Sequence, residues 1–246
     1  MKLIICKNYE EMSQEAAKIF IDQVNEKPDS VLCLATGSTP VGMYRELARA
    51  NVAGGVDFSR VTTVNLDEYY PISPDHPQSY RYFMNENLFH HINIPIENTH
   101  VPNGSAESPK IACKMYDDLI AETGGIDLGL LGIGNNGHIA FNEPGEELTV
   151  GTHVETLTEN TRVANSRFFN SMDEVPTHAL TMGIGSILSA RRIVILASGV
   201  AKYEAVKNLM TDKISTNCPA TLLKVHPDVT LICDREAFEG RELPCC

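Results

Sequence analysis

Apolar and polar positions alternate along the chain in blocks that predict strands and helices in turn. Short apolar runs with the length of buried strands lie at residues 3–6, 31–35, 61–66, 126–131, 193–197 and 230–233. Longer segments with apolar residues at helical spacing lie between them, at 10–25, 41–50, 78–88, 109–122, 179–189 and 201–210. This alternation predicts an α/β fold, a doubly wound and mainly parallel sheet with helices on both faces.

One stretch interrupts this alternation. Residues 145–176 are polar and rich in Thr and Glu, which is typical of a mobile lid over a site or of a long surface segment. No Pro- or Ser-rich linker divides the 246 residues, and their 43% hydrophobic content is enough to bury a sizeable core. We therefore expect a single domain over residues 1–246, with a candidate lid at about 145–176.

Composition and charge narrow the range of partners. The formal net charge of −12 repels polyanions, which argues against nucleic-acid binding. No apolar run approaches the ~18 residues of a membrane span, and the N-terminus becomes polar too soon for a signal peptide. The seven cysteines lack C-x-x-C spacing and suit reduced thiols. We expect a cytoplasmic protein that binds small molecules and neither nucleic acid nor membrane.

The most informative stretch follows the apolar run 126–131 and reads GIGNNGHIAFNEP, at 132–144. In doubly wound sheets, ligands bind beyond the carboxyl ends of the strands, where glycines let backbone N–H groups approach an anion. His138 is suited to proton transfer near neutral pH, and Glu143 is placed to orient it or to share its charge. The stretch therefore indicates a catalytic turn.

Two other interpretations of the same stretch stay open. It spells G-x-G-x-x-G, the fingerprint of dinucleotide sites, but Asn142, Pro144 and Gly145 interrupt the long helix that such a turn should open. An acidic residue does follow about twenty positions on, at Glu155 or Glu159, without a convincing second strand to carry it. Alternatively, this is a structural turn whose His and Glu satisfy backbone groups.

A second turn with binding features follows the run 31–35 and reads TGSTP, at 36–40. Hydroxyls, a glycine and the start of the next helix together form a cradle for an anion such as phosphate. The turn lacks the Gly-Lys-Ser/Thr ending of a P-loop, which argues against a nucleoside triphosphate. An ordinary Ser/Thr helix cap fits the same residues.

A third turn reads NLDEY, at 65–69. Asp67 and Glu68 lie where the run 61–66 ends, on the same edge of the predicted sheet as the other two turns. Adjacent acids at a strand end are usually solvated or capping. A carboxylate held near a carbon acid acts as a general base, however, and the agreement of three turns favours that role.

Together, these turns resemble the glucosamine-6-phosphate deaminase family, also called glucosamine-6-phosphate isomerases. The resemblance covers nearly the whole chain and rests on LATGSTP at 34–40, NLDEY at 65–69, GIGNNGHIAFNEP at 132–144 and TRVANSRFF at 161–169. The related 6-phosphogluconolactonases are not expected to carry the FNEP and NSRFF runs. The resemblance implies a Rossmann-like catalytic domain that converts glucosamine 6-phosphate and water to fructose 6-phosphate and ammonia.

The resemblance also implies catalytic roles. Asp67 would remove the C2 proton of the open-chain sugar. His138, supported by Glu143 and Asn136, would shuttle the proton that opens the pyranose ring. No metal or organic cofactor is expected, because the nitrogen of the substrate conjugates with the developing double bond.

The resemblance places the phosphate on a separate set of residues, namely Gly37, Ser38, Thr39, Arg167 and Lys202. An arginine fork and a lysine beside backbone donors suit a dianion. A surface ion pair for Arg167 and a solvated side chain for Lys202 are the alternatives. Further candidate substrate contacts are Glu68, Gly132 and Gly134.

Two departures from better-known relatives affect the expected behaviour. Some relatives have Asp where this chain has Asn136, so we expect His138 to be held less strongly as imidazolium. Hexameric relatives that are activated by N-acetylglucosamine 6-phosphate carry basic residues where this chain has His153 and Glu155. We expect no such activation, and a monomer or a small homo-oligomer.

Two other classes of function stay open at this point. A non-catalytic sugar-phosphate sensor would keep the phosphate turn, but it should lack Asp67 and His138 and carry a DNA-binding domain. A nucleotide-dependent oxidoreductase rests on the glycines of residues 132–137 alone. Fold does not fix function, whereas sites do, and the three turns favour the deaminase.

Overall fold

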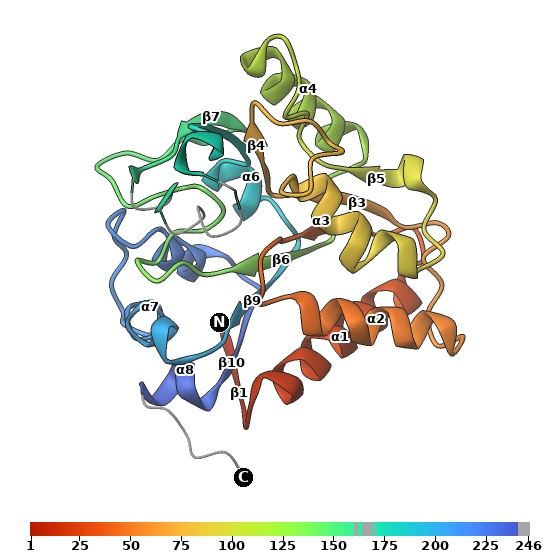
Figure 1. Ribbon diagram of the computed structural model, residues 1–246. Coiled ribbons are helices and arrows are strands. Elements are labelled where there is room, and N and C mark those ends of the chain that lie inside the picture. Colours follow the sequence, from red (N-terminus) through yellow and green to blue (C-terminus); the bar gives the residue numbers. More distant parts are fainter. Residues whose placement is uncertain (160–161, 164–168, 170, 241–246) are drawn as a thin grey trace.

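The computed structural model describes residues 1–159, 162–163, 169 and 171–240 (Figure 1). Within this part of the chain, the main sheet has seven strands, and every neighbouring pair is parallel. In spatial order the strands are β1 (Lys2–Cys6), β10 (Val229–Asp234), β9 (Arg192–Ala197), β6 (Leu128–Gly132), β2 (Val31–Leu34), β3 (Thr62–Asn65) and β5 (Thr99–His100).

The strands form where the sequence has uninterrupted apolar runs. β2 and β10 are buried along their whole length, because a parallel sheet that is covered on both faces leaves neither side of its central strands exposed to solvent. Each predicted strand is confirmed to within about two residues, the usual scatter of element ends. The two-residue strand β5 was not predicted.

Helices cover both faces of the sheet (Figure 1). α1 and α2 pack against each other, and α1 and α8 both contact β1 and β10, from opposite sides. The predicted doubly wound α/β fold is therefore confirmed.

The α-helices are α1 (Tyr9–Glu26), α2 (Val41–Val52), α3 (Tyr80–Asn87), α4 (Pro109–Glu122), α6 (Ile184–Leu188), α7 (Tyr203–Leu209) and α8 (Arg235–Glu239). The 3-10 helices lie at Phe89–His91, Ile96–Asn98, Met172–Glu174, Val200–Lys202 (η4) and Pro219–Val225. Among the helices in the described residues, none combines the length and apolar character that crossing a bilayer requires.

The strand order reverses between β2 and β6. From β2 the chain continues outward to β3 and β5, whereas from β6 it continues in the other direction to β9 and β10. At such a reversal the connections diverge to opposite faces and leave a crevice beyond the carboxyl ends of the strands, where doubly wound proteins bind ligands.

A second, antiparallel sheet corrects one prediction. Its strands are β4 (Asp67–Tyr70), β8 (His178–Thr181) and β7 (His153–Thr156), with β8 in the centre. The predicted helix at 179–189 is wrong, because its first residues form β8 and only the short α6 follows. Pairing with β4 and β7 overrides the helical preference of Ala and Leu.

Strand β7 corrects two further expectations. The segment 145–176 is not one continuous surface excursion, since residues 153–156 pair with β8. The expectation that no strand carries Glu155 is also wrong. β7 belongs to the second sheet, however, and runs antiparallel to β8, so Glu155 does not complete the parallel βαβ unit of a dinucleotide site.

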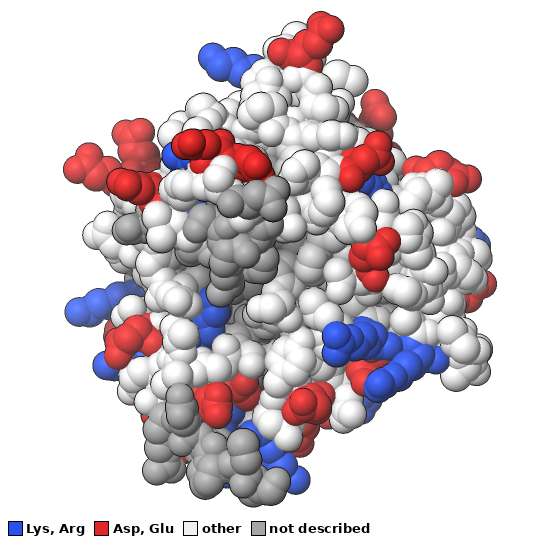
Figure 2. Space-filling model, in the orientation of Figure 1, with Lys and Arg blue, Asp and Glu red and all other residues white. Residues whose placement is uncertain are grey.

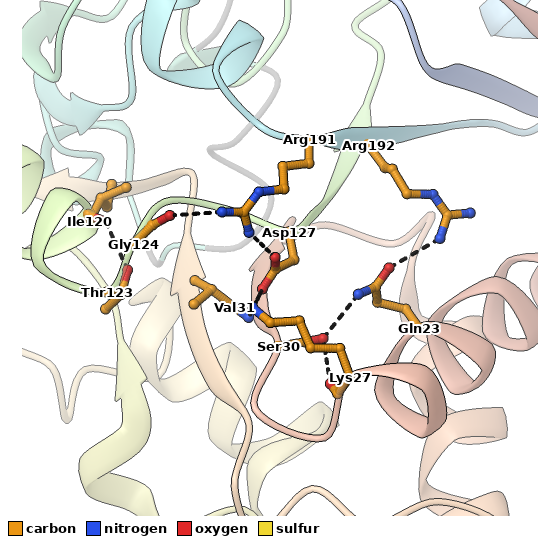
Figure 3. A network of polar contacts seen from close by, with 10 residues as sticks. All are labelled: Gln23, Lys27, Ser30, Val31, Ile120, Thr123, Gly124, Asp127, Arg191 and Arg192. Atoms are coloured by element: carbon orange, nitrogen blue, oxygen red, sulfur yellow. Dashed lines mark hydrogen bonds and ion pairs between the residues drawn. The ribbon is translucent and has the colours of Figure 1, made fainter.

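The opposite, amino-terminal edge of the main sheet is held by a polar network around Asp127 (Figure 3). The buried carboxylate of Asp127 pairs with Lys27 at 2.5 Å and with the guanidinium of Arg191, and it accepts the backbone N–H of Val31 at 2.8 Å. These partners lie next to the first residues of β2, β6 and β9, so a single carboxylate joins three strands at their starts.

Candidate active site

The turns singled out in the sequence meet at the carboxyl edge of the main sheet. Four neighbouring parallel strands, β9, β6, β2 and β3, end at this edge. They are followed by Lys202, by the loop 132–144, by the turn 36–40 and by Asp67, in that spatial order. The structure therefore brings these predicted residues to one rim of the fold, on both sides of the strand reversal.

The turn after β2 contains backbone N–H groups and hydroxyls that are available for hydrogen bonds to a ligand. Gly37 has φ of +91°, a left-handed conformation that glycine adopts without strain. No Ser or Thr side chain caps the first turn of α2 among the described residues, so the Ser/Thr cap interpretation is wrong. Among the described residues, no hydrogen bond involves the hydroxyls of Ser38 or Thr39. Uncapped N–H groups and unused hydroxyls at a helix start form an anion site.

Tyr9 holds this turn from the side and was missed in the sequence. Its hydroxyl donates to the backbone oxygen of Ser38 at 3.1 Å and accepts the N–H of Gly42 at 2.7 Å. Because Tyr9 belongs to the first turn of α1, the contact links two helices that are distant in sequence. Nothing in the local pattern around a tyrosine at a helix start indicates such a contact.

Lys202 lies at the end of η4, directly before α7. The predicted helix 201–210 therefore begins as a 3-10 turn. Burial lowers the pKa of Lys202, and within the described part of the chain no carboxylate pairs with it. A partly buried cation without a partner is suited to an anionic ligand. Arg167, the other predicted phosphate ligand, lies outside the described residues.

The loop after β6 contains a side chain packed directly against the backbone of a glycine and one residue in a left-handed conformation. A Cβ on Gly134 would lie 2.4 Å from the ring of His138, so only glycine permits the imidazole to pack there. Ala140 has φ of +53°, a conformation that costs a non-glycine residue about 1 kcal/mol. Gly132, at the end of β6, has open space where a Cβ would stand. The strain at Ala140 is typical of a functional loop.

Within the loop, three side chains are joined. Nδ1 of His138 lies 3.3 Å from Oε1 of Glu143. Asn136 donates from Nδ2 to Oε2 of Glu143 at 2.8 Å, and its Oδ1 accepts the backbone N–H of His138 at 3.2 Å. The predicted support of His138 by Glu143 and Asn136 thus has a geometric basis, although Nδ1 lacks the alignment of a hydrogen bond.

The second sheet fastens this loop next to Asp67. The backbone N–H of Phe141 donates to Oγ1 of Thr181 at 3.1 Å, and Thr181 is the cross-strand partner of Asp67. Asn142 donates from Nδ2 to the backbone oxygen of Met182 at 2.9 Å. Both anchors were missed, because the segment that carries Thr181 was predicted to be a helix.

Asp67 is buried, and no cation neutralises it in the part of the chain that the structure describes. It is 7% exposed, and burial, with a second contribution from the charge of Glu68, raises its pKa to about 8. No cation or hydrogen-bond donor contacts its carboxylate among the described residues. Desolvation disfavours the charged form, and so makes the carboxylate a stronger base.

Glu68 points to the other side of β4, as alternation along a strand requires. Its two oxygens accept the backbone N–H groups of Tyr69 (2.9 Å), Tyr80 (2.8 Å) and Arg81 (2.9 Å). Burial raises its pKa to about 7, although these N–H groups oppose the shift. With both oxygens bonded to the start of α3, Glu68 is better placed to position Asp67 than to contact a substrate.

Comparisons with known proteins agree with this geometry. The model of the Glucosamine-6-phosphate isomerases/6-phosphogluconolactonase family matches residues 7–232. A glucosamine-6-phosphate deaminase of Clostridium perfringens (strain 13 / Type A) is 57% identical over 237 residues, which are 96% of this chain and 98% of the relative. A glucosamine-6-phosphate deaminase of Geobacillus sp. (strain WCH70) is 53% identical over 238 residues, 97% of this chain and 95% of the relative.

Solved structures give the same placement. A protein described as a monomeric glucosamine-6-phosphate deaminase has a TM-score of 0.95 and 50% identity, covering 98% of this chain and 100% of its own. A 6-phosphogluconolactonase from Leishmania guyanensis has a TM-score of 0.75 at 22% identity, covering 100% and 99%, a likeness that concerns the fold alone. The chain belongs to the glucosamine-6-phosphate isomerase/6-phosphogluconolactonase family, and within it to the glucosamine-6-phosphate deaminases.

Proposed function

We propose that this protein is an enzyme of amino-sugar catabolism that converts glucosamine 6-phosphate and water to fructose 6-phosphate and ammonia. The observation that carries the proposal is the junction at Thr181, which holds the loop of His138 beside Asp67, whose carboxylate has no partner within the described part of the chain. The deaminases at 53–57% identity support the same reaction.

In this proposal Asp67 is the general base. It takes the C2 proton of the open-chain amino-aldose, and the electrons of the C–H bond form a C1–C2 double bond while the π electrons of the C1 carbonyl move to O1, which takes up a proton. A proton then returns at C1, which leaves an iminium at C2, and water hydrolyses it to the ketone and ammonium. A base with a pKa of about 8 is better matched to this task near neutral pH than an ordinary carboxylate.

His138 serves the step before proton abstraction. The pyranose ring opens when the ring oxygen gains a proton and the C1 hydroxyl loses one, and an imidazole can do both in turn. Glu143 lies 3.3 Å from Nδ1 and supports the imidazolium that forms after proton uptake. Asn136 fixes Glu143 without adding charge.

The phosphate is proposed to bind at the turn of Gly37, Ser38 and Thr39, with Lys202 and Arg167 as cations. Backbone N–H groups at the start of α2, and the ammonium of Lys202, which has no carboxylate partner among the described residues, favour this placement. Gly132, with open space where a Cβ would stand, is proposed to let the sugar approach the backbone, whereas the corresponding space at Gly134 is taken by the ring of His138. No metal or organic cofactor is required, because the substrate's nitrogen stabilises the double bond.

Assembly, regulation and location are also proposals. We expect a single catalytic domain, a monomer or small homo-oligomer, cytoplasmic, in which residues around 145–176 close over the site. Within the described residues, His153 pairs with Glu155 at 3.3 Å on β7. This acidic environment would repel an effector phosphate, so N-acetylglucosamine 6-phosphate should leave the rate curve hyperbolic and unchanged.

One assay tests the proposed reaction. The purified protein is incubated with glucosamine 6-phosphate, and ammonia and fructose 6-phosphate are measured together. Equal amounts of both products are expected, with no added metal or cofactor. Absence of either product, or release of ammonia without the ketose, would refute the proposal.

A further inference from the structure

A cleft beside the phosphate turn contains a cation that the proposed mechanism does not use. It is lined by Tyr9, Ser38, Thr39, Val41, Arg45 and Ser198. Ser38 and Thr39 follow β2, and Ser198 follows β9, so the cleft opens at the carboxyl edge of the sheet. Among the described residues, Arg45 is the only basic side chain in this lining.

Arg45 is directed to this cleft by its position on α2. It lies in the second turn of the helix, and helical side chains lean back toward the N-terminus of their helix, here toward the turn of Gly37 to Thr39. Space-filling atoms show basic side chains over the α1–α2 layer, on a face that carries acidic groups elsewhere (Figure 2).

Arg45 also has no protein partner within residues 1–159, 162–163, 169 and 171–240. Among the described residues, no hydrogen bond or ion pair involves its guanidinium. Arg49, one turn further along α2, pairs instead with Glu46 at 2.5 Å and lines a different groove, between α1 and α2. In a chain with a net charge of −12, an unpaired arginine beside two unused hydroxyls is suited to an anion.

We propose that Arg45 is a further phosphate-binding residue, whose guanidinium contacts the phosphate of the sugar substrate from the outer side of the turn. The inference rests on the proposed function. N–H groups in the first turn of α2, other than that of Gly42, which donates to Tyr9, would bind the phosphate from below, Ser38 and Thr39 from the side, and Arg45 from the solvent side, where a forked guanidinium can bind two oxygens.

The Michaelis constant tests this role. Arg45→Gln should raise KM for glucosamine 6-phosphate about ten-fold and leave kcat within about two-fold, because uniform binding to ground and transition states is lost. Arg49→Gln removes the same charge from the same helix and should leave both constants unchanged. Arg45→Lys should recover part of the affinity. A KM for Arg45→Gln equal to that of the Arg49→Gln control would overturn the proposal.

Inorganic phosphate tests the same site without turnover. Its inhibition constant, or its dissociation constant by calorimetry, should rise in Arg45→Gln by the same factor as KM and stay constant in Arg49→Gln. If KM rises but phosphate affinity does not, Arg45 does not bind the phosphate and the inference is wrong. If the wild-type protein releases no ammonia, the proposed reaction fails, while the calorimetric comparison still decides the role of Arg45.

Discussion

Two buried aspartates at opposite edges of one sheet have opposite electrostatic surroundings. Asp127, at the amino edge, is neutralised by Lys27 and Arg191 and accepts the N–H of Val31, and these partners lower its pKa despite burial (Figure 3). Asp67, at the carboxyl edge, has no such partners among the described residues, and burial raises its pKa to about 8. The same residue type thus serves stability at one edge and base chemistry at the other.

The difference extends beyond the two carboxylates. At the amino edge Gln23 donates to Ser30 and accepts from Arg192, each at 3.0 Å, so the polar groups satisfy one another. At the carboxyl edge, the hydroxyls of Ser38 and Thr39 have no partner among the described residues. Groups left unsatisfied in the free protein are available to a ligand, at a cost in stability.

Replacing Asp67 or Asp127 by asparagine should give the largest difference between the two edges, and the difference should be in kcat. Asp67→Asn should lower kcat about 10³-fold, because a positioned base contributes between about 10² and 10⁴. Asp127→Asn should keep kcat within about three-fold wherever the protein is folded. Ammonia release under saturating substrate measures both. Similar losses in the two variants would remove the distinction between the edges.

His138→Gln tests the other catalytic group at the carboxyl edge. Without an imidazole to move protons at the ring oxygen, turnover should fall about 10²-fold. Substrate that reaches the site already as the open chain bypasses this step, so the loss should be smaller in reactions started from fructose 6-phosphate and ammonium. An unaltered forward rate would show that His138 does not open the ring.

Cations at the two edges allow a matched comparison. Lys202→Ala should raise KM about 30-fold, since a charge-assisted phosphate contact is worth about 2 kcal/mol, and should leave the unfolding free energy nearly unchanged. Arg191→Ala should lower the unfolding free energy and leave KM unaltered. Steady-state kinetics and urea unfolding of both variants check this pairing, and a Lys202 variant with normal KM would exclude it from the phosphate site.

Stability against pH should separate the two acids. The raised pKa of Asp67 favours folding below about pH 4, and this contribution is lost as the pH rises through about 8. The lowered pKa of Asp127 favours folding above about pH 4, and this contribution is lost as the pH falls through the lowered value.

Urea unfolding from pH 3 to 8 measures both effects. Asp127→Asn should cost about 2 kcal/mol at pH 7, less than a fully buried pair because Lys27 and Arg191 are largely exposed, and little at pH 3. Asp67→Asn should instead flatten the loss of stability between about pH 4 and 8. Identical pH profiles for the two variants would contradict the assignment of these surroundings.

The smallest expected effect is that of Glu68 on the pKa of the neighbouring Asp67. The charge of Glu68 contributes to the raised pKa of Asp67, after burial. Glu68→Gln should therefore shift the acid limb of the kcat/KM profile about one pH unit downward, whereas a purely structural role would lower kcat/KM at all pH values alike. Asn136→Asp is expected to change mainly the pH dependence of kcat/KM, because the added carboxylate would interact with His138.

The sequence predicts the candidate site at the carboxyl edge of the sheet better than the polar network around Asp127 at the amino edge. Apolar runs locate β2 and β6 because both strands are buried on two faces, and the turns after them fall at one rim by the geometry of parallel strands. Asp127 gives no such signal, since its partners Lys27 and Arg191 are 100 and 64 residues away along the chain.

The second sheet could not be predicted for a similar reason. Residues 178–181 have helix-forming Ala and Leu, and only pairing with β4 and β7 makes them a strand. Thr181, which joins Asp67 to the loop of His138, was therefore missed. Arg167 stays a prediction, because it lies outside the described residues.

Cleavage of the C2–H bond is the most direct test of Asp67 as the base. Glucosamine 6-phosphate deuterated at C2 is incubated with the wild-type protein, Asp67→Asn and Asp127→Asn, and loss of the C2 deuteron is followed by NMR. We predict cleavage at the wild-type rate in Asp127→Asn and about 10³-fold slower cleavage in Asp67→Asn. Cleavage at the wild-type rate in Asp67→Asn would contradict the assignment of the base.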